Sequence, residues 1–325
     1  MTSDTSSSGS AGTVAPEERP GAIDAVPVRH PWRWVAIVVI AVLTAMFVNM
    51  LLTNPAFDWA FIFEAMVQTP VIRGMLLGTL LTTVLAMVVG ITLGVVFAVM
   101  RLSGNPILSG VAWTFTWFFR AIPRLVLLTI MGALGILFSE GLGIGVPFDT
   151  QILSLFGIDG TMRIANLDAN AIFTGLVGGV IGLGVSEGAY MAEIARAGIV
   201  SVDKGQTEAA EAIGMSPGKT MRRIVLPQAM RVIVPPTGNE TIAMLKDTSL
   251  LIGIPVTTEL FFQLRSLGSR TYKVFEVLVA ACLWYLVVTS VLMVGQYYLE
   301  RYFGRGFGPS PKATKAKMTE IEADH

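Results

Sequence analysis

The stretch Gly74–Met100 reads GMLLGTLLTTVLAMVVGITLGVVFAVM and contains 27 consecutive uncharged residues. It is bounded on either side by a single base, Arg73 and Arg101. About 20 predominantly apolar residues carry a helix across the hydrocarbon layer of a bilayer, which is about 30 Å thick. The stretch is therefore long enough to cross a membrane, and it predicts a transmembrane helix.

The composition of the whole chain agrees with a membrane protein. Of the 325 residues 53% are hydrophobic and 14% charged, and the mean hydropathy is +0.66, whereas soluble domains carry about 25% charged residues. The formal net charge is zero, so we expect no nucleic-acid partner. One cysteine, Cys282, and two histidines, His30 and His325, argue against a disulfide framework, a metal site and histidine-dependent catalysis.

Apolar stretches elsewhere predict about six transmembrane helices and an all-α polytopic fold. Besides Gly74–Met100, the expected spans are 34–57, 107–138, 169–186, 232–255 and 277–299. The first lacks a cleavage site, so we interpret it as an uncleaved anchor. The third contains Arg120 and Arg124 around Pro123, with Arg124 expected near a membrane interface. The fifth contains Pro235-Pro236, which should kink or interrupt its helix. That break either lines a cavity or is a plain bend.

Small residues four positions apart recur within these spans. The pairs are Gly74/Gly78, Gly90/Gly94, Gly175/Gly179 and Gly184/Gly188. Such pairs let helix backbones approach closely in a membrane. They predict helix-packing faces.

The distribution of charge predicts which loops are cytoplasmic. Bases concentrate in 191–231 and after residue 300, whereas the 54–72 and 139–168 connections are acidic. By the positive-inside rule both termini are then cytoplasmic. The 256–276 connection breaks the pattern because it is basic yet should be external. The polar segments 1–30 and 306–325 are expected to be disordered cytoplasmic tails.

The loop 202–230, called the knob below, is too polar for lipid. Glu208–Ile213 is a good helix former and Gly214 a natural stop. Ser216-Pro217 then predicts the start of a second short helix, which Pro227 should end. On these residues alone the knob either inserts into a groove of a soluble partner or is a solvated loop.

The amino-acid sequence of the knob resembles a known motif. Glu208-Ala209-Ala210, Gly214, Ile224 and Leu226-Pro227, at their spacings, match the EAA motif of permease subunits of bacterial ABC importers. The resemblance covers about 190 residues, from Thr116 to Phe307. Phe119–Pro123, Gly188–Gly198 and Lys246–Leu250 are similar to the polar amino acid (histidine, glutamine and glutamate) permeases. The chain departs from the pattern at Ala121-Ile122 and Glu187, in its additional first helix and in a long 139–168 insert.

The resemblance implies a five-helix type I importer core at 70–304 with an extra N-terminal transmembrane helix at 31–57, in the bacterial cytoplasmic membrane. It implies four kinds of partner: two ATPase subunits, the chain itself or a sister permease, an extracytoplasmic solute-binding protein, and membrane lipid. ATP and Mg would bind in the ATPases, so this chain carries no cofactor and is no enzyme. It would move polar amino acids inward by alternating access, with a lean to glutamate or glutamine. The implied ATPase-coupling residues are Glu208, Ala209, Ala210, Gly214, Arg222, Arg223, Ile224, Leu226 and Pro227.

Ionisable residues at membrane depth are candidates for the solute path. A zwitterionic amino acid needs a cation for its carboxylate and an acceptor for its ammonium group. The candidates are Lys246, Asp247, Thr248, Ser249, Asn239, Glu240, Glu187 and Arg120. Two alternatives stay open. These charges are structural pairs within broken helices, or the chain is an ATP-independent secondary transporter or channel in which Lys246 and Asp247 relay an ion or proton.

Overall fold

The computed structural model describes residues 31–304 except 56 and 255, and the chain divides into two units. The described part of the first unit is α1 (Pro31–Thr53), a helix whose length and composition suit a membrane span. It corresponds to the helix expected at 31–57 and ends at Thr53. The expected tails 1–30 and 306–325 lie outside the described residues.

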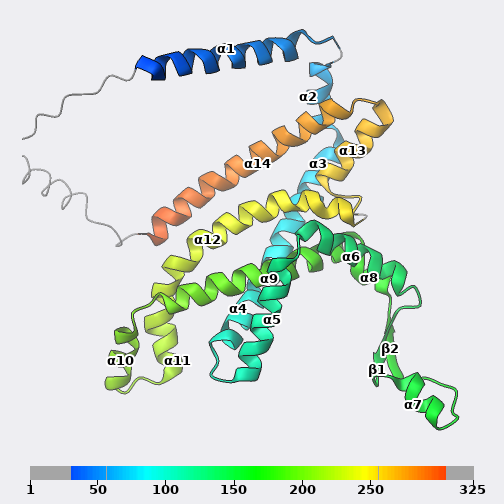
Figure 1. The fold of residues 1–325 in the computed structure, drawn as a ribbon, viewed down its shortest axis with the longest axis vertical. Coiled ribbons are helices and arrows are strands. Elements are labelled where there is room, and N and C mark those ends of the chain that lie inside the picture. The colour runs from blue at the N-terminus through cyan, green and yellow to red at the C-terminus, as the bar shows by residue number, and fades with distance from the viewer. Residues whose placement is uncertain (1–30, 56, 255, 305–325) are drawn as a thin grey trace, which may run out of the picture. The chain divides into compact units, whose positions relative to one another are not determined.

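The second unit, residues 54–306, is a helical bundle (Figure 1). Its elements are α2 (Trp59–Val67), α3 (Thr69–Arg73), a π-helical turn (Gly74–Leu80), α4 (Leu81–Leu102), α5 (Pro106–Ala121), α6 (Arg124–Leu137), β1 (Leu142–Gly145), α7 (Asp149–Leu155), β2 (Arg163–Leu167), α8 (Ala169–Phe173), α9 (Gly175–Val200), α10 (Lys204–Ala212), α11 (Pro217–Thr220), a π-helical turn (Met221–Val225), α12 (Leu226–Asp247), a 3-10 turn (Thr248–Gly253), α13 (Leu260–Thr271) and α14 (Val274–Phe303).

Four helical stretches are long and apolar enough to cross a membrane. They are α1, Thr69–Leu102, α9 and α14, and the bent pair α5 and α6 adds a fifth. The remaining expected span, 232–255, corresponds to α12, which is helical over 22 residues but is not among the helices long and apolar enough to cross a membrane.

Helices α4 and α9 pack closely because glycines remove side chains from their contact. A Cβ on Gly184 would lie 2.7 Å from the Cβ of Val89, and one on Gly188 would lie 2.8 Å from the Cβ of Leu93. Gly90 on α4 faces α9 in the same way. The predicted packing faces at Gly90/Gly94 and Gly184/Gly188 are therefore present, whereas a Cβ on Gly175 would meet nothing within 4 Å.

Two clusters of buried apolar side chains hold the bundle together. One joins α2, α3, α13 and α14 around Ile62, Leu260 and Val277. The other joins α4, α6, α9 and α12, and includes Leu183 and Met244. The second cluster fixes the three helices that carry the charged site described below.

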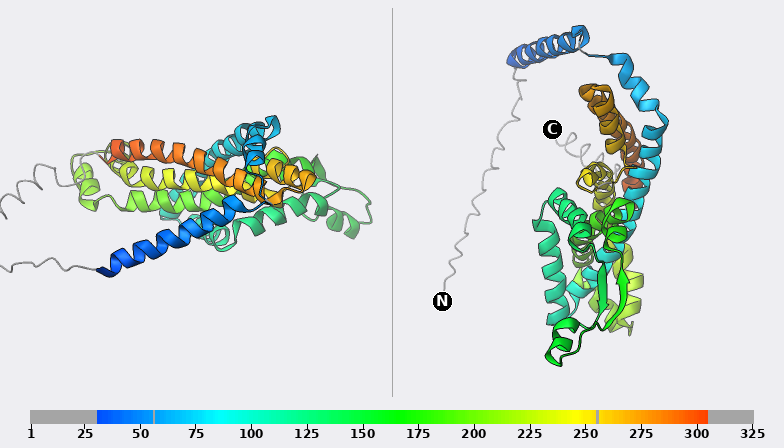
Figure 2. Two further views of the ribbon diagram at one scale, coloured as in Figure 1. Left: turned by 90° about the horizontal axis from the view of Figure 1, so that it is seen from above. Right: turned by 90° about the vertical axis from the view of Figure 1, so that its right-hand side faces the viewer.

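The knob and the expected external loops lie at opposite ends of this unit. Figure 2 shows α10 and α11 at one end, and α13 with the β1–β2 hairpin at the other. At the same end of the unit as the hairpin, Lys273 Nζ lies 2.6 Å from Asp58 Oδ2. This hydrogen bond from Lys273 is the main cause that lowers the pKa of Asp58. The pair shows that the 54–72 and 256–276 connections lie together.

Two predicted helix breaks at prolines are absent. Pro235-Pro236 does not interrupt α12, which is continuous from Leu226 to Asp247, and the predicted kink there stays a prediction. This part of α12 is supported by α14, where Gln296 Nε2 donates to the Pro235 carbonyl at 2.9 Å. Nor does Pro227 end the second knob helix, because the backbone runs on into α12. The preceding π turn, in which the Leu226 N–H donates to the Met221 carbonyl, widens the helix where the proline ring would otherwise clash.

The spans 107–138 and 169–186 also differ from expectation. The first is two helices, α5 and α6, bent by 101° between Ala121 and Arg124. In the second, the short helix α8 precedes α9, which begins only at Gly175 and continues to Val200. A two-stranded antiparallel hairpin pairs Leu142 with Leu167 and is the exception to the all-α expectation among the described residues.

Candidate functional site

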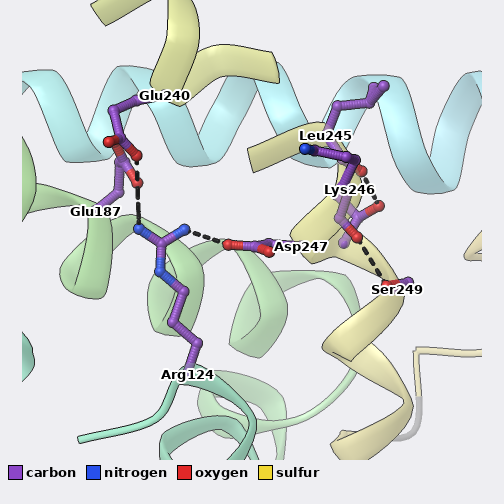
Figure 3. Close-up of polar contacts among 8 residues, drawn as sticks. Arg124, Glu187, Glu240, Leu245, Lys246, Asp247 and Ser249 are labelled. Atoms are coloured by element: carbon purple, nitrogen blue, oxygen red, sulfur yellow. Dashed lines mark hydrogen bonds and ion pairs between the residues drawn. The ribbon is translucent and has the colours of Figure 1, made fainter. Parts of the chain in front are cut away.

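Four charged side chains meet between α6, α9 and α12 (Figure 3). Arg124 Nη2 lies 2.8 Å from Glu187 Oε2 and 4.0 Å from Glu240 Oε2. Arg124 Nη1 is hydrogen-bonded to Asp247 Oδ2. One guanidinium group is thus surrounded by three carboxylates.

The break between helices α5 and α6 at Pro123 determines the position of Arg124. Pro123 is the N-cap residue of α6, and Arg124 is the first residue of that helix. Its guanidinium lies over the ring of Tyr190 on α9, 4.7 Å from the ring centroid. Arg120, at the end of α5, lies over the same ring at 5.5 Å. Both arginines that flank the proline therefore stack on one tyrosine.

Glu187 is fully buried, with 0% of its side chain exposed. Room for it exists because α4 has Gly90 at this point, where a Cβ would lie 2.7 Å from Glu187 Cγ. Glu187 Oε2 is paired with Arg124, but Oε1 has no hydrogen-bond partner among the residues that the structure describes. The neighbouring Ser186 hydroxyl is also buried and has no partner within the same residues.

The cluster has more acceptors and negative charge than its own donors satisfy. Three carboxylates against one guanidinium leave an excess of two negative charges when all are ionised. A buried acceptor without a partner costs about 1–3 kcal/mol. The arrangement therefore suits a ligand that brings a positively charged hydrogen-bond donor.

The structure brings together three of the predicted candidates, Glu187, Glu240 and Asp247. Arg120 joins them only through Tyr190. Lys246 and Asn239 are exposed, and the Lys246 side chain makes no ion pair among the described residues. Lys246 and Asp247 are therefore not partners of each other, since Asp247 pairs with Arg124.

Two further candidates bond elsewhere. Ser249 Oγ donates to the Lys246 carbonyl at 2.7 Å. Thr248 is buried; its Oγ1 donates to the Leu245 carbonyl at 2.8 Å and lies 3.5 Å from Glu259 Oε1. The same carboxylate accepts from Thr79 Oγ1 and Tyr285 Oη, both at 2.9 Å. Glu259, which lies in the 256–276 connection, is 1% exposed and caps α13.

Arg124 is the functional candidate that sequence analysis missed. It was expected near an interface, whereas its side chain is 12% exposed and lies at the centre of the cluster. Its position directly after Pro123 was the available signal. No group of three or more His, Cys, Asp or Glu side chains that could hold a metal ion occurs in the described part of the chain.

An apolar cavity of about 880 Å³ lies between α4, α9, α12 and the end of α14. Thr241, next to Glu240, lines it, as do Met221 and Leu226 beside the knob. The cavity therefore lies beside the start of the knob, and none of the four charged cluster residues is among its lining residues.

The knob itself consists of α10 and α11 joined at Gly214, whose φ is +78°. Glu208, Arg222 and Arg223 are exposed, and Ala210 is buried. Ile213, beside the glycine, is 78% exposed. Of the other predicted coupling residues Ala209, Leu226 and Pro227 are exposed and Ile224 is half-buried.

Comparison with known proteins identifies the family and the fold. Residues 90–305 match the family model described as binding-protein-dependent transport system inner membrane component. The arginine transport system permease protein ArgU of Corynebacterium glutamicum is 41% identical over 318 residues, which cover 96% of this chain and 92% of that protein. The probable glutamine ABC transporter permease protein GlnM of Bacillus subtilis is 38% identical over 133 residues, 41% of this chain and 61% of that protein.

A solved structure agrees with the fold. The match is to a chain in the crystal structure of an amino acid ABC transporter with histidines. The aligned region covers 76% of the present chain and 99% of the chain in that structure. The two are 29% identical, with a TM-score of 0.56. The chain therefore belongs to the family of binding-protein-dependent transport system inner membrane components, among the amino acid permeases of ABC importers.

Proposed function

We propose that this chain is the membrane-spanning subunit of an ATP-driven importer that moves a polar amino acid inward. The observation that carries the proposal is the charged cluster of Arg124, Glu187, Glu240 and Asp247, built on three helices of a permease fold. Its buried, unpartnered Glu187 Oε1 supplies an acceptor for a ligand. Arg124 supplies a cation for the carboxylate of an amino acid.

The charge of the cluster favours a cationic amino acid. Three carboxylates surround Arg124, so a positively charged side chain is attracted and a glutamate side chain is opposed. The relative that covers 96% of this chain is an arginine permease. Glutamine is the second candidate, because GlnM is also similar and a neutral amide can donate to Glu187. The predicted lean to glutamate is the least compatible with these charges.

The rest of the cycle belongs to partner subunits. Two ATPase subunits bind ATP and Mg, an extracytoplasmic solute-binding protein delivers the amino acid, and a second permease completes the pathway. Both termini and the knob face the cytoplasm of a bacterial cell. The inner helices rock between outward- and inward-facing states, which is a rigid-body switch.

The knob couples the ATPases to this movement. Its exposed Glu208, Arg222 and Arg223 form charge-assisted hydrogen bonds to an ATPase groove, and Ile213 contributes apolar contact. Ala209, Ala210 and Gly214 allow the two backbones to approach closely. Because the knob continues into α12 through a helical turn, displacement of the knob moves the helix that carries Glu240 and Asp247.

An ATP-independent transporter with a Lys246–Asp247 relay is the less supported alternative. Asp247 is engaged by Arg124 rather than Lys246, and the family is one of binding-protein-dependent systems. The test is competition in whole cells that express the complete complex. Uptake of labelled arginine should be blocked by excess unlabelled arginine and lysine and much less by glutamate. Strong competition by glutamate alone would contradict the cationic assignment.

A further inference from the structure

The segment 139–168, called the outer appendage, lies outside the membrane-spanning helices and remains uncovered. It contains β1, α7 and β2, and a lone two-stranded hairpin is at best marginally stable in water. Leu155 is 85% exposed, Phe156 74% and Ile164 88%. So many large apolar side chains on a small element are typical of a contact surface rather than of a free one.

The outer appendage is acidic. It contains Glu140, Asp149, Asp159 and Asp168 against Arg163 alone, a net charge of −3. Asp149 pairs with Arg163 at 4.0 Å, whereas Glu140 and Asp159 are exposed and make no ion pair among the residues that the structure describes. This charge opposes an anionic lipid surface, and it also opposes contact between two outer appendages.

A complementary surface occurs on the same chain at residues 265–275, called the α13 corner. Arg265 and Arg270 are exposed, with no ion pair in the described part of the chain. Tyr272 is 91% exposed and Phe275 56%. The third base, Lys273, is already paired with Asp58. The α13 corner thus offers free positive charge beside exposed aromatic rings, which matches an acidic apolar partner.

The placement of the two surfaces excludes a contact within one copy and favours one between copies. Figures 1 and 2 show α13 and the β1–β2 hairpin at the same end of residues 54–306 but on opposite sides of it. A two-fold axis beside this end brings each surface of one copy toward the opposite surface of the other. Two such contacts then form at once.

We infer that the outer appendage of one copy packs on the α13 corner of a second copy, so that this chain pairs with itself. The inference rests on the proposed function, in which two permeases form one pathway. The proposed partner of the outer appendage is a second copy of this chain. The test distinguishes it from three other partners: the solute-binding protein, a sister permease and lipid.

The test is cross-linking between two differently tagged copies in membrane vesicles that also contain the ATPase and binding protein. Cys282, the single native cysteine, is first replaced by serine in both copies. One copy carries Leu155→Cys in α7 and the other Val274→Cys at the α13 corner, which is 54% exposed. In the matched control, the second copy carries Ile107→Cys instead of Val274→Cys. Ile107 lies at the start of α5 and is 74% exposed.

After addition of a mild thiol oxidant, which accepts the two electrons, we expect a disulfide between Leu155→Cys of one tagged copy and Val274→Cys of the other, and only background cross-linking in the control pair. Arg265→Glu with Arg270→Glu should lower the yield, and Glu140→Lys with Asp159→Lys in the opposite copy should restore it. Equal yields in the test and control pairs would overturn the inference. So would cross-links of Leu155→Cys only to the binding protein or a sister permease, or burial of its thiol in lipid.

ATP-driven uptake by the same vesicles is measured first. Uptake without the cross-link rejects the pairing alone. Absence of uptake rejects the proposed function, while the cross-link still reports on the pairing.

Discussion

Replacing Glu187 by glutamine removes one negative charge from the cluster and keeps the size of the side chain. Arg124 remains paired with Asp247 and lies near Glu240, so the guanidinium does not become an isolated buried charge. The amide oxygen can still accept from Arg124. The fold should therefore survive, and the effect should be concentrated on a cationic ligand.

The size of the effect follows from the unpartnered Oε1 of Glu187. A hydrogen bond to a charged group contributes about 1.5–3 kcal/mol. At about 1.4 kcal/mol per tenfold change, the loss weakens arginine binding by roughly 10- to 150-fold. Citrulline has almost the shape of arginine without its charge, and a neutral hydrogen bond contributes only about 0.5–1.5 kcal/mol, so its binding should weaken less, by roughly 2- to 13-fold.

The assay measures equilibrium binding of labelled arginine and citrulline to the purified permease and ATPase complex without the solute-binding protein. The matched control is Glu193→Gln, which changes a glutamate on the same helix that pairs with Arg196 at 2.8 Å and lies outside the cluster. The control should bind both ligands as the parent does. Equal weakening of arginine and citrulline by Glu187→Gln, or unchanged arginine binding, would refute the reasoning.

Three further predictions concern the knob, the helix packing and the solute path. Gly214→Trp should abolish uptake and transport-stimulated ATP hydrolysis, because a residue other than glycine at this left-handed position costs about 1–2 kcal/mol and the side chain blocks docking. Gly218→Trp, which has equal free space and no positive φ, should retain more activity, and equal loss in both would count against the bend. Gly90→Ala should lower the stability of the complex by about 1–3 kcal/mol through overpacking against α9, whereas Gly110→Ala, where a Cβ meets nothing, should raise the melting temperature slightly. A parallel shift in both variants would contradict the packing argument. Lys246→Ala should reduce the uptake rate while the ATPases stay bound in a pull-down, since the exposed Lys246 holds no structural ion pair, and unchanged uptake kinetics would remove it from the solute path.

The general architecture could be predicted from the sequence because lipid imposes a strong local rule. A helix such as Gly74–Met100 needs about 20 apolar residues, and this rule can be applied without tertiary information. The glycine pairs on α4 and α9 were equally local signals of close packing. The knob could be predicted too, since Gly214 and Pro217 mark its bend and its second helix.

The centre of the site could not be predicted in the same way. Whether Arg124 faces an interface or the bundle depends on the 101° bend at Pro123, which sequence periodicity does not determine. The same limit applies to Pro235-Pro236, where packing on α14 overrides the tendency of proline to break a helix. Thr248 was grouped with Asp247 because they are adjacent, although its hydroxyl donates to the Leu245 carbonyl at 2.8 Å and lies 3.5 Å from Glu259 Oε1.

The most direct test of the central claim is uptake of labelled arginine into proteoliposomes that contain this permease, its ATPase and its solute-binding protein. The account predicts uptake that requires ATP on the knob side and the binding protein on the opposite side, and that is lost with a hydrolysis-deficient ATPase. Arginine uptake by the permease alone, driven by an ion gradient without ATP, would contradict the account.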